Sequence, residues 1–147
     1  MKNIFAALML LGLVFNVTAQ GKELPLITLK KEIRPLKNAG EYEVRITITC
    51  EKGSVTTFAM YKEMIPLDHK NVEVTEVKNA GATFKYVNNE IKFIWSSINF
   101  SGTMEISYTI KNAGDMKPDM IGSFKFAFDQ EKQSVEMKPE DILLVKR

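Results

Sequence analysis

The sequence has very few of the residues that build most small catalytic or metal sites. It contains one cysteine, Cys50, and one histidine, His69, among 147 residues. A lone cysteine cannot close a disulfide within the chain, and one thiol with one imidazole cannot supply an ordinary zinc site. No Gly-x-Ser-x-Gly motif surrounds His69, so no nucleophile can be assigned to it. We therefore predict no catalytic residue, no cofactor and no metal site, and we predict that His69 lies in an exposed loop.

Acidic clusters suited to calcium are also scarce. Asp115 and Asp119 bracket a short loop, and Glu140 precedes Asp141, but neither pair has the spacing of an EF-hand loop. We interpret these residues as solvated loop acids. Whether a loop binds calcium through oxygen ligands alone stays open.

Charge of one sign is not concentrated anywhere. The chain has 20 basic and 18 acidic residues, and they alternate in short groups such as Lys30-Lys31-Glu32. Such interleaving is typical of a solvated surface, whereas nucleic-acid binding requires a basic block or stripe. We predict no nucleic-acid partner.

Long apolar runs are confined to the N-terminus. Residues 1–20 carry Lys2, an apolar run from Ile4 to Phe15, and the small residue Ala19 ahead of Gln20. This layout is typical of a secretory signal peptide, and the run is too short for a membrane-spanning helix. We predict cleavage near Ala19 or Gln20 and a single domain over residues 21–147 without a transmembrane anchor. The mature protein is then exported, and is periplasmic, cell-surface-associated or extracellular.

The mature part is rich in a two-residue apolar alternation. From Tyr42 to Cys50 every second residue is apolar, which indicates a half-buried strand and places Cys50 among the buried side chains. Trp95 is likewise in phase with apolar neighbours, which predicts a core position, although a ligand-binding surface position is the alternative. Strands are predicted at Leu24–Ile33, Tyr42–Cys50, Ser54–Ile65, Val72–Val77, Ala82–Val87, Ile91–Trp95, Met104–Ile110, Phe124–Phe128 and Ile142–Val145. About 7–9 short strands separated by turn signals predict an all-β antiparallel sandwich or barrel.

Two turn signals support this interpretation. Asn88 and Asn89 interrupt two strand patterns and tolerate the positive φ of a tight hairpin. The tetrapeptide Lys-Asn-Ala-Gly begins at Lys37, Lys78 and Lys111, with unequal separations and flanks that do not align. We interpret it as a recurring turn, and not as a tandem repeat or a ligand motif.

The central strands carry a family resemblance. The segments that carry the resemblance are Thr57-Phe58-Ala59-Met60, Met64-Ile65-Pro66, Gly81-Ala82-Thr83-Phe84, Ile91-Lys92-Phe93-Ile94-Trp95 and Ile106-Ser107-Tyr108-Thr109-Ile110. Their order resembles small immunoglobulin-like or cohesin-like β-sandwich modules of exported bacterial surface proteins, over residues 54–111. The resemblance implies an immunoglobulin-like sandwich that presents loops or a strand edge to another macromolecule. It implies no particular functional residue.

These observations favour a non-enzymatic exported binding or structural module that engages another protein of the cell envelope or surface through a strand edge or loops. The alternative is a carbohydrate-binding module that uses exposed aromatic residues, and a small enzyme is the third possibility. Phe124, Phe126 and Phe128 are the candidate binding residues, because alternate positions of a strand share one face. If that face is exposed it favours a binding platform, and if it is buried it favours a scaffold.

Overall fold

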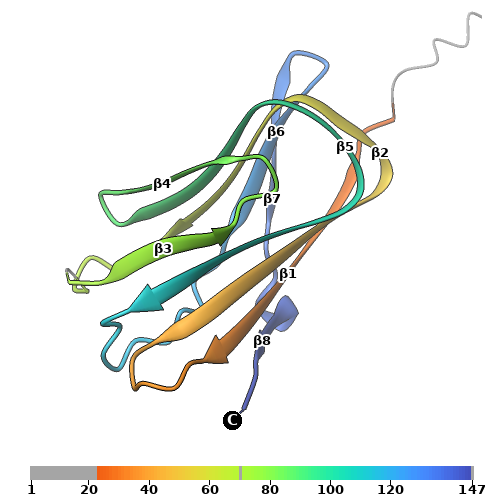
Figure 1. The fold of residues 1–147 in the computed structure, drawn as a ribbon. Coiled ribbons are helices and arrows are strands. Elements are labelled where there is room, and N and C mark those ends of the chain that lie inside the picture. Colours follow the sequence, from red (N-terminus) through yellow and green to blue (C-terminus); the bar gives the residue numbers. More distant parts are fainter. Residues whose placement is uncertain (1–22, 70, 147) are drawn as a thin grey trace, which may run out of the picture.

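The protein is built almost entirely of β-strands. The computed structural model describes residues 23–69 and 71–146, so the predicted signal peptide lies outside the described residues. The elements are β1 (Leu26–Pro35), β2 (Tyr42–Met64), β3 (Glu73–Lys78), β4 (Thr83–Val87), β5 (Glu90–Lys111), β6 (Ser123–Phe128), β7 (Glu131–Glu136), a 3-10 turn η1 (Pro139–Asp141) and β8 (Ile142–Leu144). The eight described strands confirm the all-β class (Figure 1).

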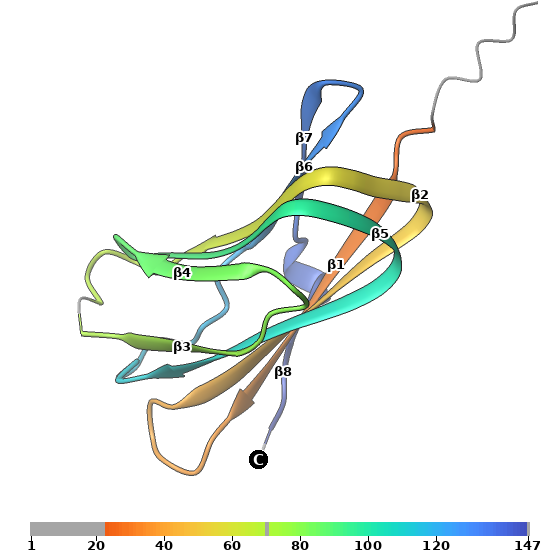
Figure 2. The ribbon, with the colours of Figure 1, turned by 45° about the horizontal axis from the view of Figure 1, so that its top comes forward.

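Two very long strands, β2 and β5, run through both layers of the sandwich. Their first-layer parts, residues 42–50 and 102–110, pair with each other. The strands of this layer follow the order β3-β5-β2-β1-β8. Their second-layer parts, residues 59–64 and 90–95, also pair, and there β4 flanks β5 while β6 and β7 follow β2. Figure 2 shows both strands curving from one layer into the other.

The bend between the layers depends on irregular backbone. The β2–β5 register shifts between Cys50 and Val55 and again between Thr57 and Ala59. Gly53 and Gly102 have φ values of 71° and 79°, and the β-branched Thr57 has φ 80°. Such bulges sharpen the twist of a strand, so a single pair of strands turns the corner of the sandwich. The two breaks predicted after Cys50 and after Trp95 are therefore bends within continuous strands.

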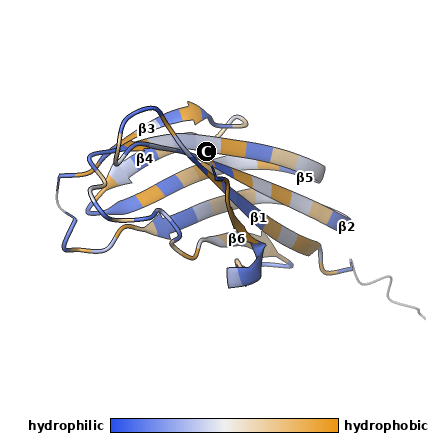
Figure 3. Ribbon diagram, turned by 90° about the horizontal axis from the view of Figure 1, so that it is seen from below, coloured by the Kyte–Doolittle hydropathy of each residue, from blue (hydrophilic) through white to orange (hydrophobic). Residues whose placement is uncertain are grey.

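The core lies between the inner faces of the two layers. Along β2 the alternation buries Val44, Ile46 and Ile48 in the first layer, and it buries Ala59 and Tyr61 in the second. Figure 3 shows the matching alternation of apolar and polar residues along the strands. Cys50 and Trp95 are 4% and 3% exposed, which confirms both core predictions.

The turn predictions are also confirmed. Asn88 and Asn89 have φ values of 53° and 61° and form the two-residue connection of the β4–β5 hairpin. All three Lys-Asn-Ala-Gly segments connect strands, and each ends in a glycine with positive φ. Two of them meet, because the Ala113 N–H donates to the Gly40 carbonyl at 3.1 Å.

One strand was not predicted. β7, with the sequence Glu-Lys-Gln-Ser-Val-Glu, is almost entirely polar. It forms because the chain reverses at Asp129 and Gln130, both with positive φ, and β7 then pairs along the whole of β6. Because β7 is an edge strand, it needs few apolar side chains. Its sequence therefore lacks the apolar–polar alternation by which the other strands were predicted.

Candidate binding surface

The three candidate phenylalanines do not form an exposed platform. Phe124 and Phe126 are 0% and 2% exposed, and Phe128 is half-buried. The Phe124 ring packs edge-on against Trp95, with the ring centroids 6.1 Å apart, so β6 turns this face towards the core. A buried face was expected for a scaffold and an exposed face for a binding platform. The burial of Phe124 and Phe126 therefore favours a scaffold and does not support an exposed aromatic site.

The residues with near-neutral or nucleophilic chemistry remain isolated. His69 lies in the loop after β2, where it is half-buried instead of fully exposed, and its nearest acidic oxygen belongs to Asp68 at 3.7 Å. Burial raises the pKa of the Cys50 thiol, and Cys50 Sγ donates to the Lys52 carbonyl at 3.2 Å. Within residues 23–69 and 71–146, no group of three or more His, Cys, Asp or Glu side chains could hold a metal ion.

The interior contains a cluster of charged and phenolic groups that joins the two layers. Lys31 Nζ from β1 lies 2.7 Å from Glu63 Oε1 on β2, and both side chains are fully buried. The Tyr61 hydroxyl donates to Glu63 Oε1 at 2.5 Å, and the Tyr108 hydroxyl donates to the other carboxylate oxygen. Lys31 Nζ also donates to the Met120 carbonyl at 3.0 Å. The ammonium and the carboxylate are thus each compensated, as burial requires.

The side chains of this cluster are closed off from solvent, since those of Lys31 and Glu63 are both 0% exposed and Tyr61 and Tyr108 are fully buried. Gly122 lies so close to it that a Cβ atom there would be 2.0 Å from the Tyr61 hydroxyl. The pKa values of Tyr61 and Tyr108 are raised well above the usual value for tyrosine. The larger cause is desolvation by burial, and the second is the negative charge of Glu63. We therefore assign the cluster a structural role, in which it fixes how the two layers face each other.

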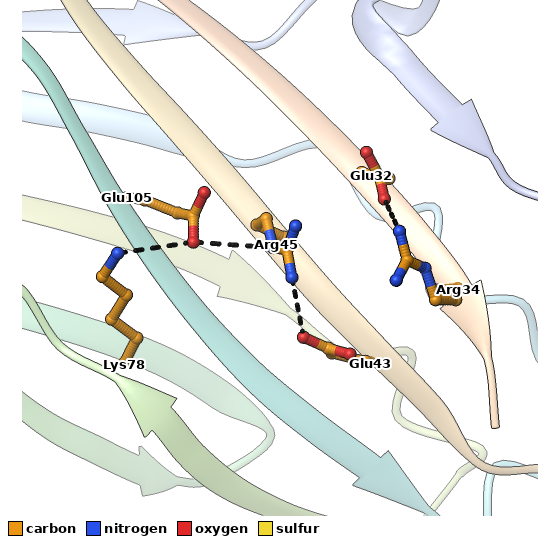
Figure 4. A network of polar contacts seen from close by, with 6 residues as sticks. All are labelled: Glu32, Arg34, Glu43, Arg45, Lys78 and Glu105. Atoms are coloured by element: carbon orange, nitrogen blue, oxygen red, sulfur yellow. Dashed lines mark hydrogen bonds and ion pairs between the residues drawn. The ribbon is translucent and has the colours of Figure 1, made fainter.

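The outer face of the first layer is mostly polar, and several of its charges are paired. Arg45 lies 3.2 Å from Glu43 and 3.5 Å from Glu105, and Lys78 joins the same network at 3.6 Å from Glu105 (Figure 4). Arg34 pairs with Glu32 at 2.8 Å on β1. Threonines fill much of the remaining face, among them the opposed pair Thr49 and Thr103. Arg34, Arg45 and Lys78 are thus paired with carboxylates of the same face, whereas Lys30 has no ion pair among the described residues and Leu143 is exposed there.

The outer face of the second layer differs in charge. Lys85 on β4 lies opposite Lys92 on β5, and Lys92 lies opposite Lys62 on β2, so three lysines form one row across three strands. Lys125 on β6 lies in the adjacent row, opposite Met60. Glu90 pairs with Lys62 at 2.7 Å and also with Lys92. Among the described residues, Lys85 and Lys125 have no ion-pair partner, so this face keeps an excess of positive charge.

Apolar side chains lie among these lysines. Phe58, Met64 and Val87 are 41%, 49% and 60% exposed, and Met60 and Ile94 are half-buried. Four of them belong to β4 and to the second-layer parts of β2 and β5, and Phe58 lies in the bulge of β2 just before its second-layer part. Exposed apolar side chains also occur on first-layer strands, as at Val77 and Leu143, but among the described residues only those on the second face lie beside a row of lysines. Apolar side chains next to unpaired basic groups are typical of an interaction surface. The outer face of the second layer is therefore the candidate binding surface.

The free edge of β4 borders this surface. β4 pairs with β5 on one side, and no described strand pairs with its other side. Its side chains alternate, with Thr83, Lys85 and Val87 exposed and Phe84 and Tyr86 half-buried. An unpaired edge of this kind can accept another strand.

Sequence reasoning missed both the basic face and the buried cluster. Lys31 and Glu63 occupy inward-facing positions of strands whose other inward residues are apolar. This departure from the apolar pattern was the feature of the sequence that could have indicated the cluster. The lysine row needed the register of three strands, which the sequence does not supply. Lys62, Lys85 and Lys92 are each ordinary outward-facing residues when considered alone.

Comparisons with known proteins support the fold class. No protein-family model and no curated protein matches the chain by sequence. The GH20 exo-β-N-acetylglucosaminidase of Vibrio harveyi is structurally similar over 82% of this chain and 19% of its own, with TM-score 0.55 and 7% identity. ACE19, the collagen-binding subdomain of the Enterococcus faecalis surface protein ACE, matches 78% of this chain and 95% of its own, with TM-score 0.46 and 10% identity. The seventh ScaB type I cohesin of Pseudobacteroides cellulosolvens matches 80% and 88%, with TM-score 0.37 and 10% identity.

At these identities the likeness concerns the fold alone. The described part of the chain is an eight-stranded all-β sandwich. This chain spans 19% of the length of the Vibrio enzyme it matches. In the part of the chain that the structure describes, no helix is long and apolar enough to cross a membrane.

Proposed function

We propose that this protein is a non-enzymatic, exported module that binds another protein of the cell envelope or surface. The proposed contact surface is the outer face of the second layer together with the adjoining edge of β4. The observation that carries the proposal is the contrast between the two outer faces. On the first face Arg34, Arg45 and Lys78 are paired with carboxylates, whereas the second face combines the exposed Phe58, Met64 and Val87 with a lysine row across three strands. The first face also carries Lys30 and the exposed Leu143, but the register of its described strands brings no lysines into one row.

The second face has two properties that favour protein binding. Covering Phe58, Met64 and Val87 removes apolar surface from water, which is the main favourable contribution to most protein association. The lysines favour an acidic partner, increase its association rate and select its orientation. A flat sheet face is less suited to a small ligand, because such ligands bind in concave pockets.

The carbohydrate-binding alternative loses its main support. It required Phe124, Phe126 and Phe128 on an exposed face, and two of these rings are buried. An enzyme remains the least favoured function, because the one charged cluster that the described residues bury serves to join the two layers.

Export is part of the proposal and has its own test. The apolar run from Ile4 to Phe15 with Ala19 before the expected site predicts removal of residues 1–20. N-terminal sequencing of the protein recovered outside the cytoplasm should begin at or near Gln20 or Gly21. A folded soluble product that retains Met1 would contradict export by this route.

Site-specific crosslinking in the producing cells tests the binding surface. A photoreactive amino acid placed at Thr83 or Ser134, on the second face, should give a discrete protein adduct. The same group at Thr49 or Thr103, on the first face, provides the matched control, since these threonines also lie on a sheet surface. Equal crosslinking from both faces, or crosslinking only to glycan, would overturn the proposal.

A further inference from the structure

We infer that the edge of β4 receives an extended segment of the partner whose side chains alternate between acidic and apolar. The inference rests on the proposed protein-binding function and adds the chemistry of the partner. It starts from the free edge of β4, which is paired only with β5. A strand added there would extend the second layer through backbone hydrogen bonds, a recurring mode of peptide recognition.

The outward side chains of the added strand would continue the lysine row. The row ends at the edge with Lys85, which is exposed and has no ion-pair partner among the described residues. A residue of the added strand directly opposite Lys85 would have its Cβ about 4.5 to 5.5 Å from that of the lysine. An acidic side chain at this position completes a cross-strand charge pair, whereas a basic one would be repelled.

Glu90 shows that the lysine row accommodates a carboxylate. Its two oxygens contact Lys62 and Lys92 on neighbouring strands, and these contacts lower the pKa of Glu90 to about 2. Glu90 thus occupies the inner part of the row in the free protein. It leaves Lys85, at the outer end, for a carboxylate from another chain.

The inward side chains of the added strand would meet an aromatic surface. Phe84 and Tyr86 point to the other face of β4, where each is only half-buried, and Phe84 packs on Phe93 with the ring centroids 5.1 Å apart. An apolar residue beside these rings would cover the part that is still exposed. Since successive residues of a strand point to opposite faces, the two requirements together specify alternation.

An anionic polysaccharide fits this edge less well, because it offers no backbone hydrogen bonds and no apolar side chains for Phe84 and Tyr86. An anionic membrane would use Lys85 and Val87 without any need for strand pairing. Both are therefore included as competing outcomes of the test.

The probe is a short peptide, acetyl-Thr-Glu-Val-Glu-Val-Glu-Thr-amide, titrated into the mature protein and followed by calorimetry and by amide shifts in NMR. Shifts should concentrate at residues 83–87, and affinity should fall between about 50 mM and about 300 mM salt, since exposed charges are screened. A peptide of the same composition without alternation should bind at least about tenfold more weakly, as should one with methylated backbone nitrogens.

Two variants with matched controls complete the test. Lys85→Glu should weaken peptide binding by about tenfold or more, because it places like charges opposite each other. Lys30→Glu, at an exposed position of β1 in the first layer, should leave binding unchanged. Glu90→Gln should strengthen binding, whereas Glu32→Gln, which breaks a pair on the first face, should not.

Three outcomes would overturn the inference. The first is equal affinity for the alternating and the non-alternating peptide. The second is an unchanged peptide affinity in the Lys85→Glu variant. The third is that the protein binds phosphatidylglycerol vesicles or heparin but not the peptide. If the peptide fails while Thr83 and Ser134 still crosslink to a protein, only the partner chemistry is wrong. If crosslinking fails as well, the proposed function is wrong.

Discussion

The buried pair of Lys31 and Glu63 leads to a quantitative prediction about stability. Replacing Lys31 by Met keeps a similar volume but leaves Glu63 buried without its counter-ion and the Met120 carbonyl without its donor. Removing one partner of a buried pair costs about 3–5 kcal/mol. The hydroxyls of Tyr61 and Tyr108 still donate to the carboxylate, so we expect a cost near the lower end, about 3 kcal/mol.

A urea titration followed by Trp95 fluorescence measures this cost. The matched control is Glu32→Gln, which breaks an exposed pair with Arg34 on the same strand and should cost about 0–1 kcal/mol. In a double-mutant cycle, Lys31→Met and Glu63→Gln should be less destabilising together than the sum of the two separate changes. Additive costs, or a cost below about 1 kcal/mol for Lys31→Met, would refute the assignment of this pair to the core.

Three further predictions concern the core. Trp95→Ala should cost about 3–5 kcal/mol in the same titration, and a change below about 1 kcal/mol would place Trp95 outside the core. Gly122→Ala should strongly destabilise the fold, because the added Cβ would overlap the Tyr61 hydroxyl. Thermal unfolding measures this effect, and a variant as stable as the parent protein would contradict the tight contact. The raised pKa values of Tyr61 and Tyr108 predict full stability below pH about 10 and a loss above it, since the unfolded chain releases these protons first. Absorbance at alkaline pH should show both phenols ionising only as the protein unfolds, and their early ionisation would contradict the buried cluster.

The sequence predicted much of the fold because alternation reports directly on a half-buried strand. Residues 42–50 and the Asn88-Asn89 hairpin follow local rules, and the structure confirms both. The continuity of β2 was not predictable in the same way. Gly53 looks like a terminator, but the pairing with β5 resumes on its other side and carries the strand through a bulge.

The candidate site was much less predictable than the fold. The alternation of Phe124 and Phe126 identified a shared face, but only the position of β6 beside β2 decided that this face is buried. Lys31 and Glu63 are 32 residues apart, so their pairing depends on the packing of two layers. The lysine row depends on cross-strand register in the same manner. Local patterns determine strands and their inward sides, whereas a surface built from several strands requires tertiary structure.

The passage of β2 and β5 through both layers has a mechanical consequence. In a sandwich whose sheets share no strand, the layers can slide apart by losing side-chain contacts alone. Here such a movement must also straighten or break the paired bend that joins the layers. A force applied at the β4 edge would pass through β5 to β2, and from there to β1 and β8, along a continuous network of strand pairing. The edge proposed to hold a partner is thereby anchored to the opposite side of the domain.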